Sequence, residues 1–207
     1  MTRPTLIALK TLTWLACLVP FALLVFRAIT NTLGPDPTAA ITFCTGSTTL
    51  NLLTISLAVT PLRRLSPRLN WLIKFRRPLG LFAFFYASLH LMTYIALYAG
   101  FDIDAIASDV LKRRFISVGF LAWLLLLPLA ATSTNWAIRK MGGKRWSRLH
   151  KLVYVAAVLG VVHYWWQVKP GVLSPTANTL ILAALLVARP IQSTFLSWRQ
   201  RRRLRAA

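Results

Sequence analysis

Six long apolar segments dominate this sequence and constrain what the chain can fold into. Each has about 18 to 25 mostly apolar residues, the length at which a helix crosses a hydrocarbon layer about 30 Å thick. They cover residues 9–27, 43–62, 78–99, 115–132, 149–168 and 175–195. This pattern predicts an all-α, multi-pass membrane protein, in which residues 1–207 form a single bundle of six transmembrane helices. We interpret the first segment as an anchor, because it is longer than a signal-peptide core and lacks a small-x-small cleavage site.

The charged residues indicate how the chain is oriented. The sequence has 25 Lys and Arg residues against 4 acidic ones, all Asp, and a formal net charge of +21. The basic residues stand in short clusters between apolar segments, whereas a nucleic-acid binder places them on a solvated surface around a modest core. The loops on one side of the predicted bundle hold only five of the basic residues but all four acidic residues. The positive-inside rule therefore predicts that both termini are cytoplasmic, and the basic tail WRQRRRLR is expected to contact anionic lipid of the bilayer.

Histidine is the residue type on which a cofactor site in the membrane could be built. The apolar segments contain no Asp or Glu, which argues against a carboxylate-based proton or cation pump. The sequence has no CxxC or CxxCH motif for iron–sulfur, zinc or covalent haem. His90 lies 11 residues beyond Leu79, and His163 lies 14 residues beyond Leu149. These spacings place the two imidazoles at depths of roughly 16 and 21 Å from the inner boundary, on different helices.

Two imidazoles at similar depth can bind one metal from opposite sides, and the pair His90 and His163 predicts haem b. Neutral imidazole binds iron, and the apolar body of a porphyrin suits the interior of a helix bundle. A zinc site would need three or four ligands from His, Cys or carboxylate, and these do not converge here. The alternative is that each histidine only forms a hydrogen bond between helices. The matched depths favour metal ligation, and no residue of the chain is predicted to be catalytic.

A third histidine, His150, lies near the inner boundary, 13 residues before His163. Along one continuous helix this separation is roughly 20 Å, which suits a second haem, although the two side chains would face different sides. The corresponding positions before His90 hold Arg76 and Arg77, and arginine is a poor iron ligand because it stays protonated. His150 is therefore predicted either to bind the iron of a second haem or to form a hydrogen bond or a propionate contact at the interface.

Two further stretches carry weaker signals. The basic run 112–114, which contains Arg113, stands on the acidic outer side. It is predicted to neutralise haem propionates or dock an acidic partner, or alternatively to pair with the nearby aspartates. Hydroxyl side chains between Thr45 and Ser56 could line a quinone or flavin site, but such residues more often serve helix packing.

Three stretches of this sequence resemble a known family: RRPLGLFAFFYASLHLMTY, LKRRFISVGFLAWLLLLPLAATS and KRWSRLHKLVYVAAVLGVVHYWWQVK. They are similar to the MsrQ (YedZ) family, the haem-binding membrane subunits of bacterial methionine sulfoxide reductases. The resemblance extends from about residue 6 to residue 195. It implies a fold like the transmembrane domain of ferric reductases and NADPH oxidases, with haem between the third and fifth helices. His90, His150 and His163 correspond to the ligands of that pattern, and Arg76 or Arg77 takes the place of the fourth.

The resemblance also implies cofactors and partners. The family is associated with haem b and FMN, and with electrons that pass from the quinone pool to MsrP, a periplasmic molybdopterin-containing catalytic subunit that reduces methionine sulfoxide in proteins. This chain would then be the inner-membrane electron-transfer subunit of a heterodimer. The residues after the last segment are too few for a flavin and nicotinamide domain, so electrons are expected to enter from outside the chain. The alternatives are a ferric or cupric reductase subunit fed by a soluble flavin reductase, and a non-redox membrane anchor or small transporter.

Overall fold

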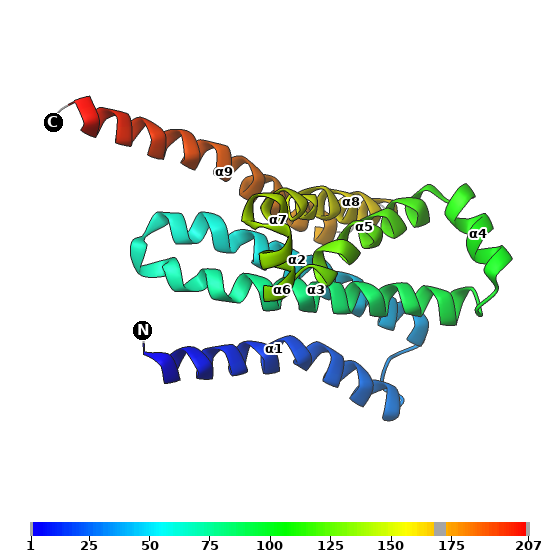
Figure 1. Ribbon diagram of the computed structural model, residues 1–207. Coiled ribbons are helices and arrows are strands. Elements are labelled where there is room, and N and C mark those ends of the chain that lie inside the picture. The colour runs from blue at the N-terminus through cyan, green and yellow to red at the C-terminus, as the bar shows by residue number, and fades with distance from the viewer. Residues whose placement is uncertain (1, 168–172, 206–207) are drawn as a thin grey trace.

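The protein is helical almost throughout the residues that the structure describes, 2–167 and 173–205. Figure 1 shows the computed structural model, in which long helices lie side by side. The six predicted segments coincide with α1 (Arg3–Ile29), α2 (Pro37–Leu65), α3 (Ile73–Thr93), α5 (Arg114–Ala131), α8 (Leu152–Gln167) and α9 (Leu173–Arg205). Within the described ranges, 4 helices are long and apolar enough to cross a membrane: α1, α2, α5, and α3 with its flanking turns. The prediction of an all-α membrane protein is thus confirmed, while the count of six spans stays a prediction.

Short elements that the sequence patterns did not separate connect the long helices. They are η1 (Pro67–Leu72), η2 (Tyr94–Tyr98), α4 (Ile103–Lys112), α6 (Asn135–Met141) and α7 (Gly143–Leu149). Before α4 the chain reverses through Gly100 and Phe101, which have φ angles of 57° and 63°, and the carboxylate of Asp102 then caps the helix by accepting from the N–H groups of Asp104 and Ala105. Figure 1 places α4 at one end of the molecule and both chain termini at the other.

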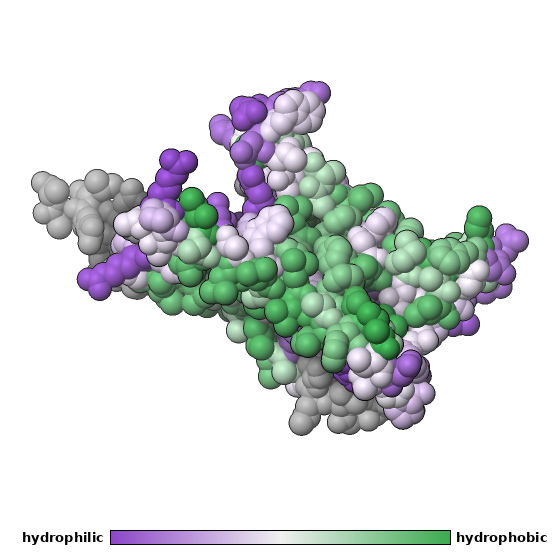
Figure 2. All heavy atoms as spheres, turned by 90° about the horizontal axis from the view of Figure 1, so that it is seen from below, coloured by the Kyte–Doolittle hydropathy of each residue, from purple (hydrophilic) through white to green (hydrophobic). Residues whose placement is uncertain are grey.

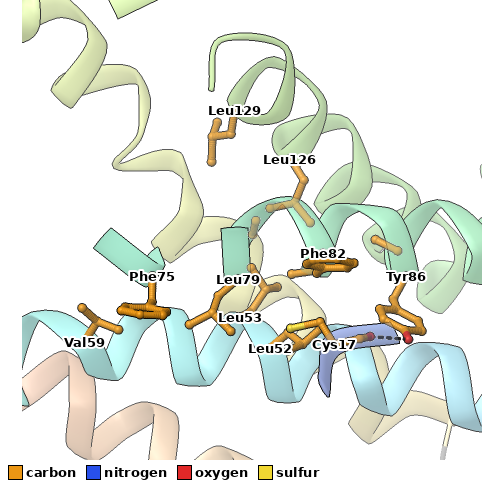
Figure 3. Packing of buried hydrophobic residues seen from close by; sticks show 13 residues of the cluster. Cys17, Leu52, Leu53, Val59, Phe75, Leu79, Phe82, Tyr86, Leu126 and Leu129 are labelled. Carbon is orange, nitrogen blue, oxygen red and sulfur yellow. Dashed lines mark hydrogen bonds between the residues drawn. The ribbon is translucent and has the colours of Figure 1, made fainter. Parts of the chain in front are cut away.

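Helix α2 lies at the centre of the fold, where other helices bury both of its sides. One side packs against α3, and Leu53 and Ala83, which are 3% and 0% exposed, belong to the cluster drawn in Figure 3. The other side packs against α8 and α9 through a second cluster, which includes Leu57, Ala157 and Leu182. The antiparallel helices α2, α3, α5 and α8 are the elements from which the site described below is built.

Helix α1 is apolar but lies at the edge of this bundle. Leu12, Trp14 and Phe26 are 62%, 52% and 62% exposed, and Figure 2 shows a broad hydrophobic surface bordered by hydrophilic side chains. A large apolar surface of this kind, on a helix long enough to span, indicates contact with lipid.

The hydroxyl group of Tyr86 joins α3 to α1 by hydrogen bonds to the backbone of α1. Its OH group accepts a hydrogen bond from the Phe21 N–H at 3.0 Å and donates one to the Cys17 carbonyl at 2.7 Å, which Figure 3 marks. Pro20 lies inside α1, and a proline ring disturbs the backbone ladder of the turn before it. The tyrosine hydroxyl therefore satisfies two backbone groups of α1 and fixes this helix against α3.

Candidate metal centre

The two histidines predicted to pair lie next to each other in the structure. His90 comes from the last turn of α3, and His163 lies close to the end of α8. Their ring centres are 5.9 Å apart and their planes are nearly perpendicular, at 85°. Two imidazoles that bind one metal from opposite sides, at about 2 Å each, have ring centres about 6 Å apart. The separation therefore matches that of two axial ligands.

Hydrogen bonds to backbone carbonyls fix the protonation of both rings. Nδ1 of His90 lies 3.0 Å from the Thr42 carbonyl oxygen, and Nδ1 of His163 lies 2.7 Å from the Phe115 carbonyl oxygen. Because a carbonyl oxygen only accepts, Nδ1 must carry the proton in each ring. In the neutral ring Nε2 is then the unprotonated nitrogen, which can bind a metal, and the carbonyl contact is the usual second contact of a metal-binding histidine.

Two glycines, which the sequence analysis missed, allow neighbouring helices to approach these rings. A Cβ atom on Gly46 of α2 would lie 3.0 Å from Cε1 of His90, and one on Gly119 of α5 would lie 2.7 Å from Nδ1 of His163. No larger side chain fits at Gly119 without displacing the imidazole. The sequence did contain a signal for these two residues, because each is the one glycine of its apolar segment and lies near the outer end of that segment. The site is thus formed by four helices: α2, α3, α5 and α8.

The donor set fits a haem better than a bare metal ion. Among the described residues there is no group of three or more His, Cys, Asp or Glu side chains that could hold a metal, whereas a structural zinc ion needs four protein ligands. A porphyrin supplies four nitrogens itself and needs only axial ligands from the protein. The neighbouring side chains include Phe115, whose ring centre lies 6.5 Å from that of His163, and Thr45, whose Oγ1 lies 3.3 Å from Nδ1 of His90. Two unprotonated Nε2 atoms next to an aromatic side chain suit haem iron.

His150 does not share a helix with His163, contrary to the prediction. α7 ends at Leu149 and α8 begins at Leu152, so His150 lies in the turn between them, which is closed by a hydrogen bond from the Lys151 N–H to the Arg148 carbonyl. The angle expected from one continuous helix therefore does not apply.

The surroundings of His150 combine an aromatic ring with two cations. Its ring stacks on Trp146 at 3.8 Å, and its Nδ1 lies 3.1 Å from the Trp146 carbonyl. Its Nε2 is buried without a hydrogen-bond partner in the described part of the chain. Arg76 and Arg77 lie within the range of electrostatic interaction with this imidazole. The structure thus places two cations on the side of the bundle where His150 lies, apart from His90 and His163.

The other predicted site residues make contacts of their own. Arg113 forms an ion pair with Asp109 at 2.9 Å, and Tyr94 donates to the same carboxylate. Arg77 donates to Asn135 at the start of α6 at 2.8 Å. Arg113 thus makes the aspartate contact that was its alternative role.

The hydroxyl groups of α2 bond mainly to their own helix. Thr49 donates to the Thr45 carbonyl and Thr54 to the Leu50 carbonyl, at 2.9 and 2.8 Å. These contacts agree with a packing role for the hydroxyl residues of this helix.

Comparison with known proteins gives consistent matches. Residues 43–161 match the family described as ferric reductase like transmembrane component, a range that ends two residues before His163. A protein of Herminiimonas arsenicoxydans named protein-methionine-sulfoxide reductase heme-binding subunit MsrQ is 48% identical over 200 residues, which cover 96% of this chain and 89% of that protein. Proteins of the same name from Ralstonia nicotianae and Azospira oryzae are 50% and 48% identical, over 77% and 89% of this chain and 73% and 79% of their own lengths.

Proposed function

We propose, on the premise that this chain belongs to the MsrQ family of ferric-reductase-like membrane proteins, that it binds haem b and transfers electrons to a methionine sulfoxide reductase subunit. In this proposal residues 1–207 form one domain with six spans in the bacterial inner membrane and both termini in the cytoplasm. The oxidised substrate is reduced by the partner, a periplasmic molybdopterin-containing protein of the MsrP type. The relatives are named as heme-binding subunits of a protein-methionine-sulfoxide reductase, which supports both haem binding and a reductase partner.

One observation carries the proposal: the pairing of His90 and His163 at 5.9 Å, each with Nδ1 bonded to a carbonyl. The two Nε2 atoms would hold the haem iron, and the carbonyls of Thr42 and Phe115 would fix the tautomer and the orientation of each imidazole. A bound haem supplies one-electron redox chemistry at its iron. The four helices around it exclude water, and the glycines permit their close approach.

The position of the pair supports transfer toward the outer side. His90 and His163 lie near the ends of α3 and α8, and Gly119 lies near the start of α5. α4 connects α3 to α5 at this end of the molecule (Figure 1). With cytoplasmic termini this end faces the periplasm, where the partner would dock, and Arg113 is proposed to contact either a haem propionate or that partner.

The inner side is proposed as the entry of electrons, from the quinone pool or from a reduced flavin such as FMN. Arg76 and Arg77 lie within electrostatic range of His150 there, and the Nε2 atom of His150, which has no hydrogen-bond partner in the described part of the chain, could bind a second iron or a propionate. Haem quantification on the wild type and on His150→Ala distinguishes these roles, because a second haem would be lost and a propionate contact would leave the haem count unchanged.

Electron transfer to the partner is the direct test of this function. The purified protein is reduced anaerobically, and reoxidation of its haem is followed after adding an oxidised MsrP-type subunit together with methionine sulfoxide. We expect fast reoxidation that requires the MsrP-type subunit, that stops when this subunit is fully reduced unless methionine sulfoxide is present, and slow reoxidation by ferric citrate. The reverse ranking would favour a metal reductase instead. A colourless preparation with full helical content would leave only the non-redox anchor.

A further inference from the structure

A cluster of arginines between α2, α8 and α9 lies outside the proposed haem sites. Arg189 of α9 donates from Nη1 to the Tyr154 hydroxyl and from Nη2 to the Leu57 carbonyl, and its guanidinium carbon lies 4.6 Å from the centre of the Tyr154 ring. Its Nε is buried and has no hydrogen-bond partner in the described ranges. This side chain therefore enters the helix interface with one donor still free.

A second arginine lies beside Arg189. Arg64, in the last turn of α2, donates from Nη1 to the Arg189 carbonyl at 3.3 Å. Two positively charged side chains therefore meet at the contact between α2 and α9.

No aspartate of this chain can reach this cluster. The four aspartates are Asp36, Asp102, Asp104 and Asp109, and the chain has no Glu. Asp36 caps the start of α2, 28 residues before Arg64, which corresponds to about 42 Å along the helix. The other three lie in or next to α4, at the end of the molecule away from the chain termini (Figure 1). An anion from outside the chain would therefore stabilise the part-buried charge of Arg189, because an unpaired cation within a membrane protein is costly.

Free polar atoms gather at the same place. In the described part of the chain, the buried side-chain atoms without a hydrogen-bond partner are Thr60 Oγ1, Arg63 Nε, His150 Nε2, Arg189 Nε and Gln192 Oε1. Four of these belong to the adjoining turns 60–63 of α2 and 189–192 of α9. Gln192 Nε2 donates to the Pro61 carbonyl at 3.3 Å, so the two turns are in direct contact. Three of these four atoms, Thr60 Oγ1, Arg63 Nε and Arg189 Nε, can donate a hydrogen bond, and unpaired donors favour a ligand with several acceptor oxygens.

We propose that Arg64 and Arg189 bind the phosphate group of an anionic phospholipid from the inner leaflet. Basic sites between membrane helices on the cytoplasmic side suit such headgroups. Exposed apolar side chains continue along the same two helices: Leu65 of α2 is 70% exposed, and Val187 and Ile191 of α9 are 57% and 62% exposed. An acyl chain can lie on these residues while the phosphate contacts the arginines, which free phosphate cannot do.

The test uses the purified haem-loaded protein after exchange of its lipid for detergent. Phosphatidylglycerol, phosphatidylcholine and inorganic phosphate are added separately, and bound lipid is counted by native mass spectrometry alongside the thermal unfolding midpoint. Arg64→Gln and Arg189→Gln are compared with Arg68→Gln, which removes an exposed charge on the same side of the membrane. Arg64 is also exposed, so its variant is expected to fold even if Arg189→Gln does not.

We expect the wild type and Arg68→Gln to retain phosphatidylglycerol and to be stabilised by it, and the Arg64→Gln variant to bind it about fivefold more weakly. Equal binding of phosphatidylcholine, equal stabilisation by inorganic phosphate, or unchanged lipid binding in Arg64→Gln would overturn the proposal. The haem spectrum of Arg64→Gln should equal that of the wild type, so a failure of the lipid site is separable from a failure of the haem assignment.

Discussion

Gly119→Ala should weaken haem binding, because the added methyl group has no room beside His163. The new Cβ would lie 2.7 Å from Nδ1 and 2.8 Å from Cε1 of that imidazole, well inside van der Waals contact. The ring must move, and its 2.7 Å hydrogen bond to the Phe115 carbonyl must then lengthen or break. Overpacking of this kind costs about 1–3 kcal/mol. If this cost falls on the haem-bound state, haem affinity drops about 5- to 150-fold.

The assay is haem titration of the apoprotein, followed by the absorption band of the bound form. Gly46→Ala should have a smaller effect, because its nearest contact is 3.0 Å, to Cε1 of His90. Gly160→Ala is the matched control, because it lies in α8 close to His163 but its nearest contact is Leu50 at 3.7 Å. Wild-type haem affinity in Gly119→Ala, or an equal loss in Gly160→Ala, would refute the reasoning.

Two further substitutions test contacts around the site. Tyr86→Phe removes the hydroxyl that bridges the Phe21 N–H and the Cys17 carbonyl. We expect a loss of about 1–3 kcal/mol in stability, measured as a lower thermal midpoint in detergent. The control Tyr98→Phe, at a side chain that is 57% exposed, should leave the midpoint unchanged. Arg113→Gln breaks the ion pair with Asp109. Because the Arg113 side chain is 58% exposed, the fall in the thermal midpoint should correspond to a loss of less than about 1 kcal/mol in stability. A larger loss would indicate that this arginine supports more than its aspartate.

The long helices and the proximity of His90 to His163 could be predicted because both follow from counting residues along the helices. A span needs about 20 apolar residues, and each residue adds 1.5 Å to a helix. The contacts of His90 and His163 could not be predicted, because the Thr42 and Phe115 carbonyls and the two glycines reach the rings only through the rotation of four helices about their axes. No local pattern encodes that rotation.

The contacts on the inner side could be predicted less well from the sequence. His150 was expected within the fifth span, but hydrogen bonds across residues 148–151 close a turn there, and an apolar run does not reveal a break of two residues. Arg189 was counted only as a basic residue that orients the chain. Its contacts with Leu57 and Arg64 join residues more than 120 positions apart, which a single sequence does not indicate.

The reduced-minus-oxidised absorption spectrum of the histidine variants tests the central assignment most directly. We expect a b-type α band in the wild type, loss of the outer haem in both His90→Ala and His163→Ala, and retention of that haem in His150→Ala, with helical content by circular dichroism confirming that each variant is folded. Full haem content and an unchanged spectrum in His90→Ala and His163→Ala would contradict the account.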